Sequence, residues 1–194
     1  MEERDRGSLE KLSEELQQLK KKLASERPSR WKEFPDIGLY KDQVLSYMLR
    51  QLINLDGDGQ LTSAMINNYI KDGLLPRTDG KKYSQEHLAG LTEICLLKQV
   101  LSVSDTGLLL RQELLNDDHA GFYTKFIQIL DHALQDTAGL IDAEWDMEAL
   151  SDMTLRLAIS SYCNKLACEE LIEIIRSRLL PEEKKKADKK AIAT

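Results

Sequence analysis

Apolar residues recur three and four positions apart in nearly every segment of the chain, a spacing that is typical of amphipathic helices. One stretch, residues 62–83, departs from this pattern, because a short helical run stops at Gly73 and a strip rich in cations follows. Gly73 stands where helices commonly end in a left-handed residue, and Pro76 lies just beyond it. The chain is therefore expected to be mainly α, with at most a small two-stranded wing at about residues 74–83.

The run before Gly73 predicts a helix at residues 62–70 with one buried and one exposed face. Thr62 and Ser63 are both suitable N-caps. The inward face is expected to hold the apolar residues that follow at helical spacing: Met65, Ile66 and Tyr69. The outward face carries polar side chains four residues apart: Ser63, Asn67 and Lys71.

A family resemblance is carried by residues 65–75 together with six later positions: Pro76, Arg77, Tyr83, Leu88, Leu91 and Ile94. This set resembles the winged helix-turn-helix of MerR-type bacterial regulators. Over residues 34–140 the chain also resembles an uncharacterised bacterial domain of unknown function, found mainly in low-GC Gram-positive organisms, with a MerR-like DNA-binding fold. Two positions differ from the MerR pattern, since Asn67 replaces the usual Arg and Asn68 the first Tyr.

The resemblance implies a transcriptional regulator that binds double-stranded DNA. Helix 62–70 would enter the major groove, where the Asn67 amide is able to pair with adenine. The expected DNA-binding residues are Ser63, Asn67, Lys71, Arg77, Lys81 and Lys82, the four cations gripping phosphates. The alternative is a non-enzymatic helical interaction module that does not bind DNA; the cationic wing favours the regulator.

The net charge of −6 does not by itself decide between these functions, because the charge is unevenly distributed. Residues 99–153 hold eleven acids against Arg111 and Lys125, so the rest of the chain is net basic. Residues 62–83 carry four cations and two acids. The expected DNA-binding patch is modest in charge.

The N-terminal segment, residues 1–30, predicts an amphipathic helix and a linker that Pro28 begins. Leucines alternate at steps of three and four, as in the a and d positions of a coiled coil: Leu9, Leu12, Leu16, Leu19 and Leu23. At little more than two heptads this helix is marginal alone. It either docks on its own domain or forms a dimer zipper, and the sequence leaves both open.

The segment before the DNA-reading helix predicts a scaffold helix from a cap at Asp42 to about Leu55. Residues 54–61 resemble the start of an EF-hand calcium loop, with Asn54, Asp56 and Asp58 at ligand positions. The bidentate acid that should close the loop is replaced by Met65. A polar turn without functional calcium is therefore expected.

The domain organisation follows from these segments. The winged helix-turn-helix is assigned to residues 31–115 and a C-terminal helical region to 116–180. The tail, residues 181–194, is charged and lacks large apolar side chains apart from Ile192, so it is expected to be disordered. A homodimer would use the N-terminal or the C-terminal helices.

Catalytic and metal chemistry find no support in the sequence. The three histidines lie far apart, and Cys163 and Cys168 share a helix face poorly, which argues against zinc. Phosphate loops, dinucleotide fingerprints and nucleophile elbows have no match. The chain is expected to be no enzyme and to need no cofactor.

The expected localisation is cytoplasmic. Met1 is followed by acidic and basic residues instead of an apolar run, so no signal peptide is expected. No apolar stretch approaches the roughly 20 residues of a membrane helix. Three cysteines within helical patterns suit a reduced compartment.

Overall fold

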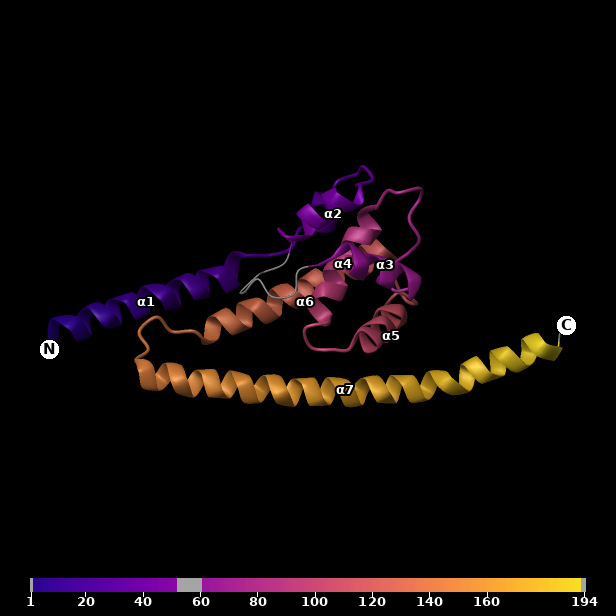
Figure 1. The fold of residues 1–194 in the computed structure, drawn as a ribbon. Coiled ribbons are helices and arrows are strands. Elements are labelled where there is room, and N and C mark those ends of the chain that lie inside the picture. Colours follow the sequence, from indigo (N-terminus) through magenta and orange to yellow (C-terminus); the bar gives the residue numbers. More distant parts are fainter. Residues whose placement is uncertain (1, 52–60, 193–194) are drawn as a thin grey trace.

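The computed structural model describes residues 2–51 and 61–192, with side chains placed for residues 7–51 and 61–179. Helices account for nearly all the regular structure of these residues (Figure 1), which confirms the mainly α expectation. The elements are α1 (Glu2–Ser25), a 3-10 turn (Trp31–Glu33), α2 (Lys41–Met48), α3 (Ser63–Lys71), α4 (Gln85–Leu97), α5 (Val103–Glu113), α6 (His119–Leu140) and α7 (Met147–Ile192).

Helix α4 forms the centre of the fold, and α2, α5 and α6 all contact it. Nine consecutive residues, 87–95, are buried, so every face of this part of the helix is covered. The largest apolar cluster surrounds it and includes residues from each neighbouring helix, among them Val44, Ile66, Leu110 and Phe122. A helix covered on all sides fixes the positions of the elements that pack on it.

The start and stop of α3 follow the sequence signals. The Thr62 side chain accepts a hydrogen bond from the Met65 backbone N–H at 3.2 Å, as expected of an N-cap. Gly73 adopts φ +71°, a left-handed conformation that favours glycine. The chain then folds back, and Leu75 becomes buried against Gly90, where an added Cβ would lie 2.7 Å from the leucine Cδ2. Gly90 therefore lets the end of the α3 turn approach α4 closely.

The cationic strip after α3 forms turns and single antiparallel bridges. Leu39 and Tyr83 exchange two backbone hydrogen bonds of 2.9 Å, and Asp79 pairs with Lys82 around Gly80. Within the described residues no strand is longer than such a bridge. Residues 74–83 therefore form a turn instead of two strands, and the Leu39–Tyr83 bridge ties this turn to the segment before α2.

Helix α1 packs along α6 through the leucine pattern of its sequence. Leu16 and Leu23 are buried with Ala138 and Ile141 in a second apolar cluster, while Leu9 and Leu19 remain exposed. Of the two interpretations of this helix, docking on its own chain is the arrangement observed.

Helix α2 is shorter than its apolar pattern predicted. It begins at Lys41 with Tyr40 as N-cap, and it ends at Met48, so the expected cap at Asp42 and end near Leu55 were wrong. The chain turns here because Gln51 is buried and bound to the linker: Gln51 Oε1 accepts from the Ser29 N–H and Nε2 donates to Ser29 Oγ. The calcium-loop interpretation of residues 54–61 falls mostly outside the described residues.

Helix α7 runs along one side of the molecule and continues to Ile192 (Figure 1). Residues 181–192, expected to be disordered, therefore extend the helix in this structure; Glu, Lys and Ala are strong helix formers. Within residues 2–51 and 61–192, no helix combines the length and apolar character that a membrane crossing requires.

Candidate functional site

The face of α3 that the sequence assigned to DNA is open to solvent. Ser63, Asn67 and Lys71 are exposed, whereas Ile66 and Tyr69 are buried in the main core. The inward and outward faces predicted from the spacing are therefore confirmed. Other elements of the fold extend this exposed face.

A groove of about 590 Å³ lies beside this face. It is walled by the start of α2, by α3 and by the cationic strip, and the Leu39–Tyr83 bridge holds the first and last of these together. The lining residues are Tyr40, Lys41, Asp42, Asn67, Ile70, Thr78, Gly80, Lys81 and Tyr83. The groove is thus a shallow depression of mixed polar and apolar lining, with two lysines and Asp42 on its walls.

A hydrogen bond crosses one end of the groove. Lys41 Nζ donates to Asn67 Oδ1 at 2.7 Å, joining the first residue of α2 to the middle of α3. The contact fixes the orientation of the Asn67 amide, whose Nδ2 stays available as a donor. Asn67 is therefore held in place by a neighbouring cation, which is itself half-buried.

The structure brings only part of the predicted set together. Asn67 and Lys81 line the same groove. The other four predicted residues are exposed but do not line it: Ser63, Lys71, Arg77 and Lys82. Lys82 leans on the segment before α2, since a Cβ added at Gly38 would lie 2.8 Å from the lysine Cβ.

Two groove residues escaped the sequence analysis, Tyr40 and Lys41. Both stand just before the expected helix cap at Asp42, and nothing in their spacing links them to α3. Their position in the helix could have indicated Lys41. A cation in the first turn does not stabilise its own helix, because the helix dipole favours acidic residues there. Lys41 in the first turn of α2 therefore suggests a partner elsewhere, and Asn67 is that partner.

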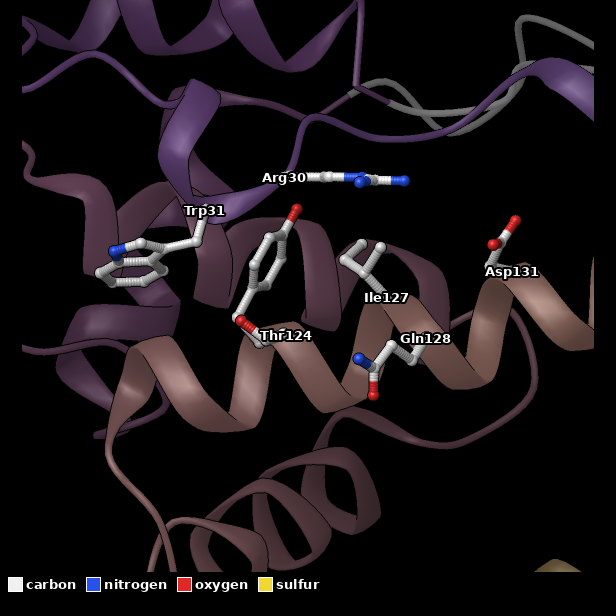
Figure 2. Close-up of a pocket in the computed structure, with 7 residues that line it drawn as sticks. Arg30, Trp31, Thr124, Ile127, Gln128 and Asp131 are labelled. Atoms are coloured by element: carbon white, nitrogen blue, oxygen red, sulfur yellow. The ribbon is translucent and has the colours of Figure 1, made fainter.

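A second, smaller cavity lies between the linker and α6, on the Trp31 side of the core (Figure 2). Arg30 and Trp31 enter from the linker, and Thr124, Ile127, Gln128 and Asp131 enter from α6. Its volume of about 200 Å³ is below the roughly 300–1,000 Å³ of most small-molecule sites. The cavity is a gap at a packed interface, and its size does not favour a ligand.

At this cavity the linker is fixed by the hydroxyl groups of two tyrosines. Tyr123 OH donates to the Ser29 backbone carbonyl at 2.8 Å, and Tyr47 OH donates to Ser29 Oγ at 3.2 Å. Glu93 of α4 lies close enough to act electrostatically on Tyr123, and burial raises the pKa of the Glu93 carboxyl to about 8. Glu93 is thus a neutral acid at pH 7, held inside the core.

Groups suited to metal binding do not converge in the part of the chain that the structure describes, where no three His, Cys, Asp or Glu side chains come close enough to share an ion. Burial lowers the pKa of His87, and its Nδ1 accepts the Ser84 backbone N–H at 3.0 Å at the start of α4. Burial raises the pKa of the Cys95 thiol to about 11, which disfavours the reactive thiolate. His87 therefore caps a helix, and Cys95 packs in the core.

Comparison with known sequences agrees with the extent of this core. The profile of a domain of unknown function, DUF1836, matches residues 29–127, which run from the Ser29 linker through most of the first half of α6. The chain belongs to this family. No curated protein and no solved structure matched the chain.

Proposed function

We propose that the chain is a DNA-binding transcriptional regulator with a MerR-like winged helix-turn-helix. In this proposal α3 enters the major groove, and the turn at residues 74–83 acts as the wing. The observation that supports it most is the groove beside α3, which is lined by an amide and two lysines from three separate elements. Base-edge and phosphate groups of a duplex require both kinds of side chain.

Asn67 is the proposed base reader. An asparagine amide pairs with adenine by accepting from N6 through Oδ1 and donating to N7 through Nδ2. In the free chain Oδ1 is bound to Lys41. On DNA the lysine would move its ammonium from the amide to a phosphate, and Asn67 would be released to the base. Lys41 thereby joins the proposed DNA-binding residues, because it keeps the Asn67 amide in a fixed orientation until DNA binds.

The cations around the groove would supply affinity without sequence preference. Lys71, Arg77, Lys81 and Lys82 are all exposed at the end of α3 and along the strip. Each phosphate that they neutralise releases counterions, so binding weakens as salt rises. Ser63, at the first turn of α3, would contact the backbone through its hydroxyl.

The test begins with a selection of genomic fragments by the purified chain at two salt concentrations. On the selected site, Lys81→Ala with Lys82→Ala should weaken binding to all sequences and reduce the salt slope by about two. Asn67→Ala should instead lose preference at one base pair, worth roughly 1–3 kcal/mol, while non-specific binding survives. A matched control is Lys11→Ala with Lys165→Ala, two exposed lysines on α1 and α7.

A variant of Lys41 separates phosphate binding from base recognition most clearly. Lys41→Met removes the phosphate contact and also frees Oδ1, so affinity should fall while the preferred base pair stays the same. If Asn67→Ala leaves the selected site unchanged, α3 is not the reader. If the selection enriches no fragment at either salt concentration, the DNA-binding proposal itself fails.

The alternative function is a helical interaction module without DNA binding. The observation in its favour is a row of exposed apolar side chains along α7. Single exposed apolar residues are common on protein surfaces, but an aligned row indicates an interaction surface. An expected homodimer through the terminal helices remains a prediction. In α1 the α6 contact buries Leu16 and Leu23 of the leucine pattern, whereas the described part of α7 keeps an exposed apolar row.

A further inference from the structure

Helix α7 has a side that faces the rest of the molecule. Leu150 packs against the α1–α6 cluster, and Ile172 is buried farther along the helix. Beyond it, Arg176 forms an ion pair with Asp105 in the first turn of α5. Between these attachments, residues 158–167 are all exposed. The body therefore holds α7 at separate points and leaves its middle uncovered.

A second, outward side of α7 carries one continuous heptad row, here called the α7 seam. Its members alternate at steps of four and three, so they share one face of the helix. They are Glu148, Asp152, Leu155, Ile159, Tyr162, Leu166, Glu169 and Glu173. Leu150 and Leu157, two residues from seam positions, point to the other side. The seam therefore faces away from the body.

The four central residues of the seam are large, apolar and open to solvent. Leu155, Ile159, Tyr162 and Leu166 are 59%, 55%, 67% and 48% exposed. A row of this kind at a and d spacing has the geometry by which helices pack on one another. Exposed aligned apolar side chains on a folded chain mark an interaction surface.

The ends of the seam are acidic, and this restricts what can cover it. Residues 142–173 hold eight acidic side chains and two basic ones. Asp152 pairs with Arg156 at 2.7 Å and Glu169 with Lys165 at 3.9 Å, but both pairs are exposed and contribute little on their own. Glu173 pairs with Arg176, the arginine that also binds Asp105. The seam thus presents an apolar centre with an acidic patch on each side.

A second copy of the seam is a poor partner for electrostatic reasons. In a parallel pair each acid would face itself. In an antiparallel pair the steps of four, three and four would align Asp152 with Glu169 and Glu148 with Glu173. Either orientation sets carboxylates against carboxylates at both ends, and like charges at such positions are repulsive.

We propose that the α7 seam binds a helix of another protein whose apolar a and d residues are bracketed by lysines or arginines. Such a helix would cover the apolar centre and place cations opposite the acids at both ends. From Glu148 to Glu173 the seam spans about 38 Å, enough for nearly four heptads of contact. The inference stands apart from DNA binding, because the groove residues take no part in it.

The test uses the full chain and a synthetic fluorescent peptide of about four heptads, with leucines at a and d in the centre and lysines at both ends. A second peptide carries glutamates in place of those lysines. In an anisotropy titration the lysine peptide should bind at least about tenfold more tightly at low salt, and the ratio should shrink as salt rises. Equal binding of the two peptides would overturn the proposal.

Variants assign the binding to the seam. Ile159→Glu should weaken binding of the lysine peptide about tenfold or more, and Glu148→Gln with Glu169→Gln, one acid at each end of the seam, should reduce its advantage over the glutamate peptide. Ile174→Glu is the matched control, because Ile174 is 55% exposed on the same helix but lies off the seam. If Ile174→Glu weakens binding as much as Ile159→Glu, the peptide is not bound at the seam.

Sedimentation of the chain alone tests whether a second copy of the chain covers the seam. The free chain should sediment as a species that Ile159→Glu does not change. A dimer of the wild-type chain that Ile159→Glu dissociates would show that two copies share the seam, and the proposed basic partner would be wrong. Circular dichroism of each variant confirms that α7 keeps its helix, and Tyr162→Ala provides a second seam variant without an added charge.

Discussion

Helices α4 and α7 both carry apolar residues on more than one face, yet they meet opposite environments. Residues 87–95 of α4 are all buried, whereas among residues 147–179 of α7 only Ile172 is. The difference is the number of neighbours, since α4 lies among α2, α5 and α6 while α7 contacts the body at separate points. Apolar residues therefore form a core in one helix and an open surface in the other.

The polar residues of the two helices also differ in burial. Within α4, Thr92 donates its hydroxyl to the Leu88 carbonyl at 2.9 Å, and Glu93 is kept protonated by burial. On α7 the acids of the seam are exposed and pair with cations one turn away. Polar side chains in α4 are constrained by the core, whereas the acids of the α7 seam lie at the surface in solvent-exposed pairs.

The largest expected effect tests the packing contrast directly. Leu91→Ala removes a side chain of α4 that is 0% exposed, and the cavity should lower the free energy of unfolding by about 2–5 kcal/mol. Leu155→Ala on the α7 seam should change it by no more than about 0.5 kcal/mol. Urea denaturation followed by circular dichroism measures both. A large loss for Leu155→Ala in the isolated chain would mean that the seam is already covered.

The next effect concerns the buried acid of α4. Because the folded chain holds the Glu93 proton up to a pKa of about 8, and the unfolded chain releases it at the ordinary carboxyl pKa, folding takes up a proton between these values. The contribution of Glu93 to stability is thus full below the ordinary pKa and is lost as pH rises toward 8. The slope is at most about 1.4 kcal/mol per pH unit.

Glu93→Gln keeps the shape of the side chain and removes its titration. Relative to this variant, the wild-type chain should lose up to about 2–3 kcal/mol of stability between about pH 6 and pH 8. Denaturation curves at several pH values give the difference, in which the titration of His87 cancels. Glu14→Gln, at an exposed position on α1, is the control for the substitution itself. If the stability of Glu93→Gln and that of the wild type change with pH in parallel, the pKa of the Glu93 carboxyl is not raised in the folded chain.

The smallest effect tests the attachment of α7. Arg176→Gln breaks two pairs, one with Glu173 within α7 and one with Asp105, whose pKa is lowered by the Ser102 hydroxyl and by the arginine. The side chains of both pairs are partly solvated, so the loss should be under about 1 kcal/mol. Hydrogen exchange should quicken in α7 near Ile172 and stay unchanged in α4. Arg156→Gln, which breaks only a pair within α7, should leave the exchange of α5 unaffected.

Local signals predicted the elements around the groove well. The hydroxyl of Thr62 caps α3, Gly73 ends it in a left-handed conformation, and Ile66 and Tyr69 turn inward as their spacing required. Each of these depends on a few neighbouring residues, so the sequence contains all the information. The end of α2 could not be predicted in this way, because Gln51 is held by Ser29, more than twenty positions earlier.

The sequence by itself determined the helical class, the caps of α3 and the outward set of Ser63, Asn67 and Lys71, since helix geometry relates residues three and four positions apart. Only the tertiary structure decided that Lys41 binds Asn67, that Glu93 is buried, and which leucine pattern is covered. The rows in α1 and α7 have the same spacing, yet α6 covers one and the other stays exposed. Spacing along a helix defines a face, and only the placement of the other helices determines what that face meets.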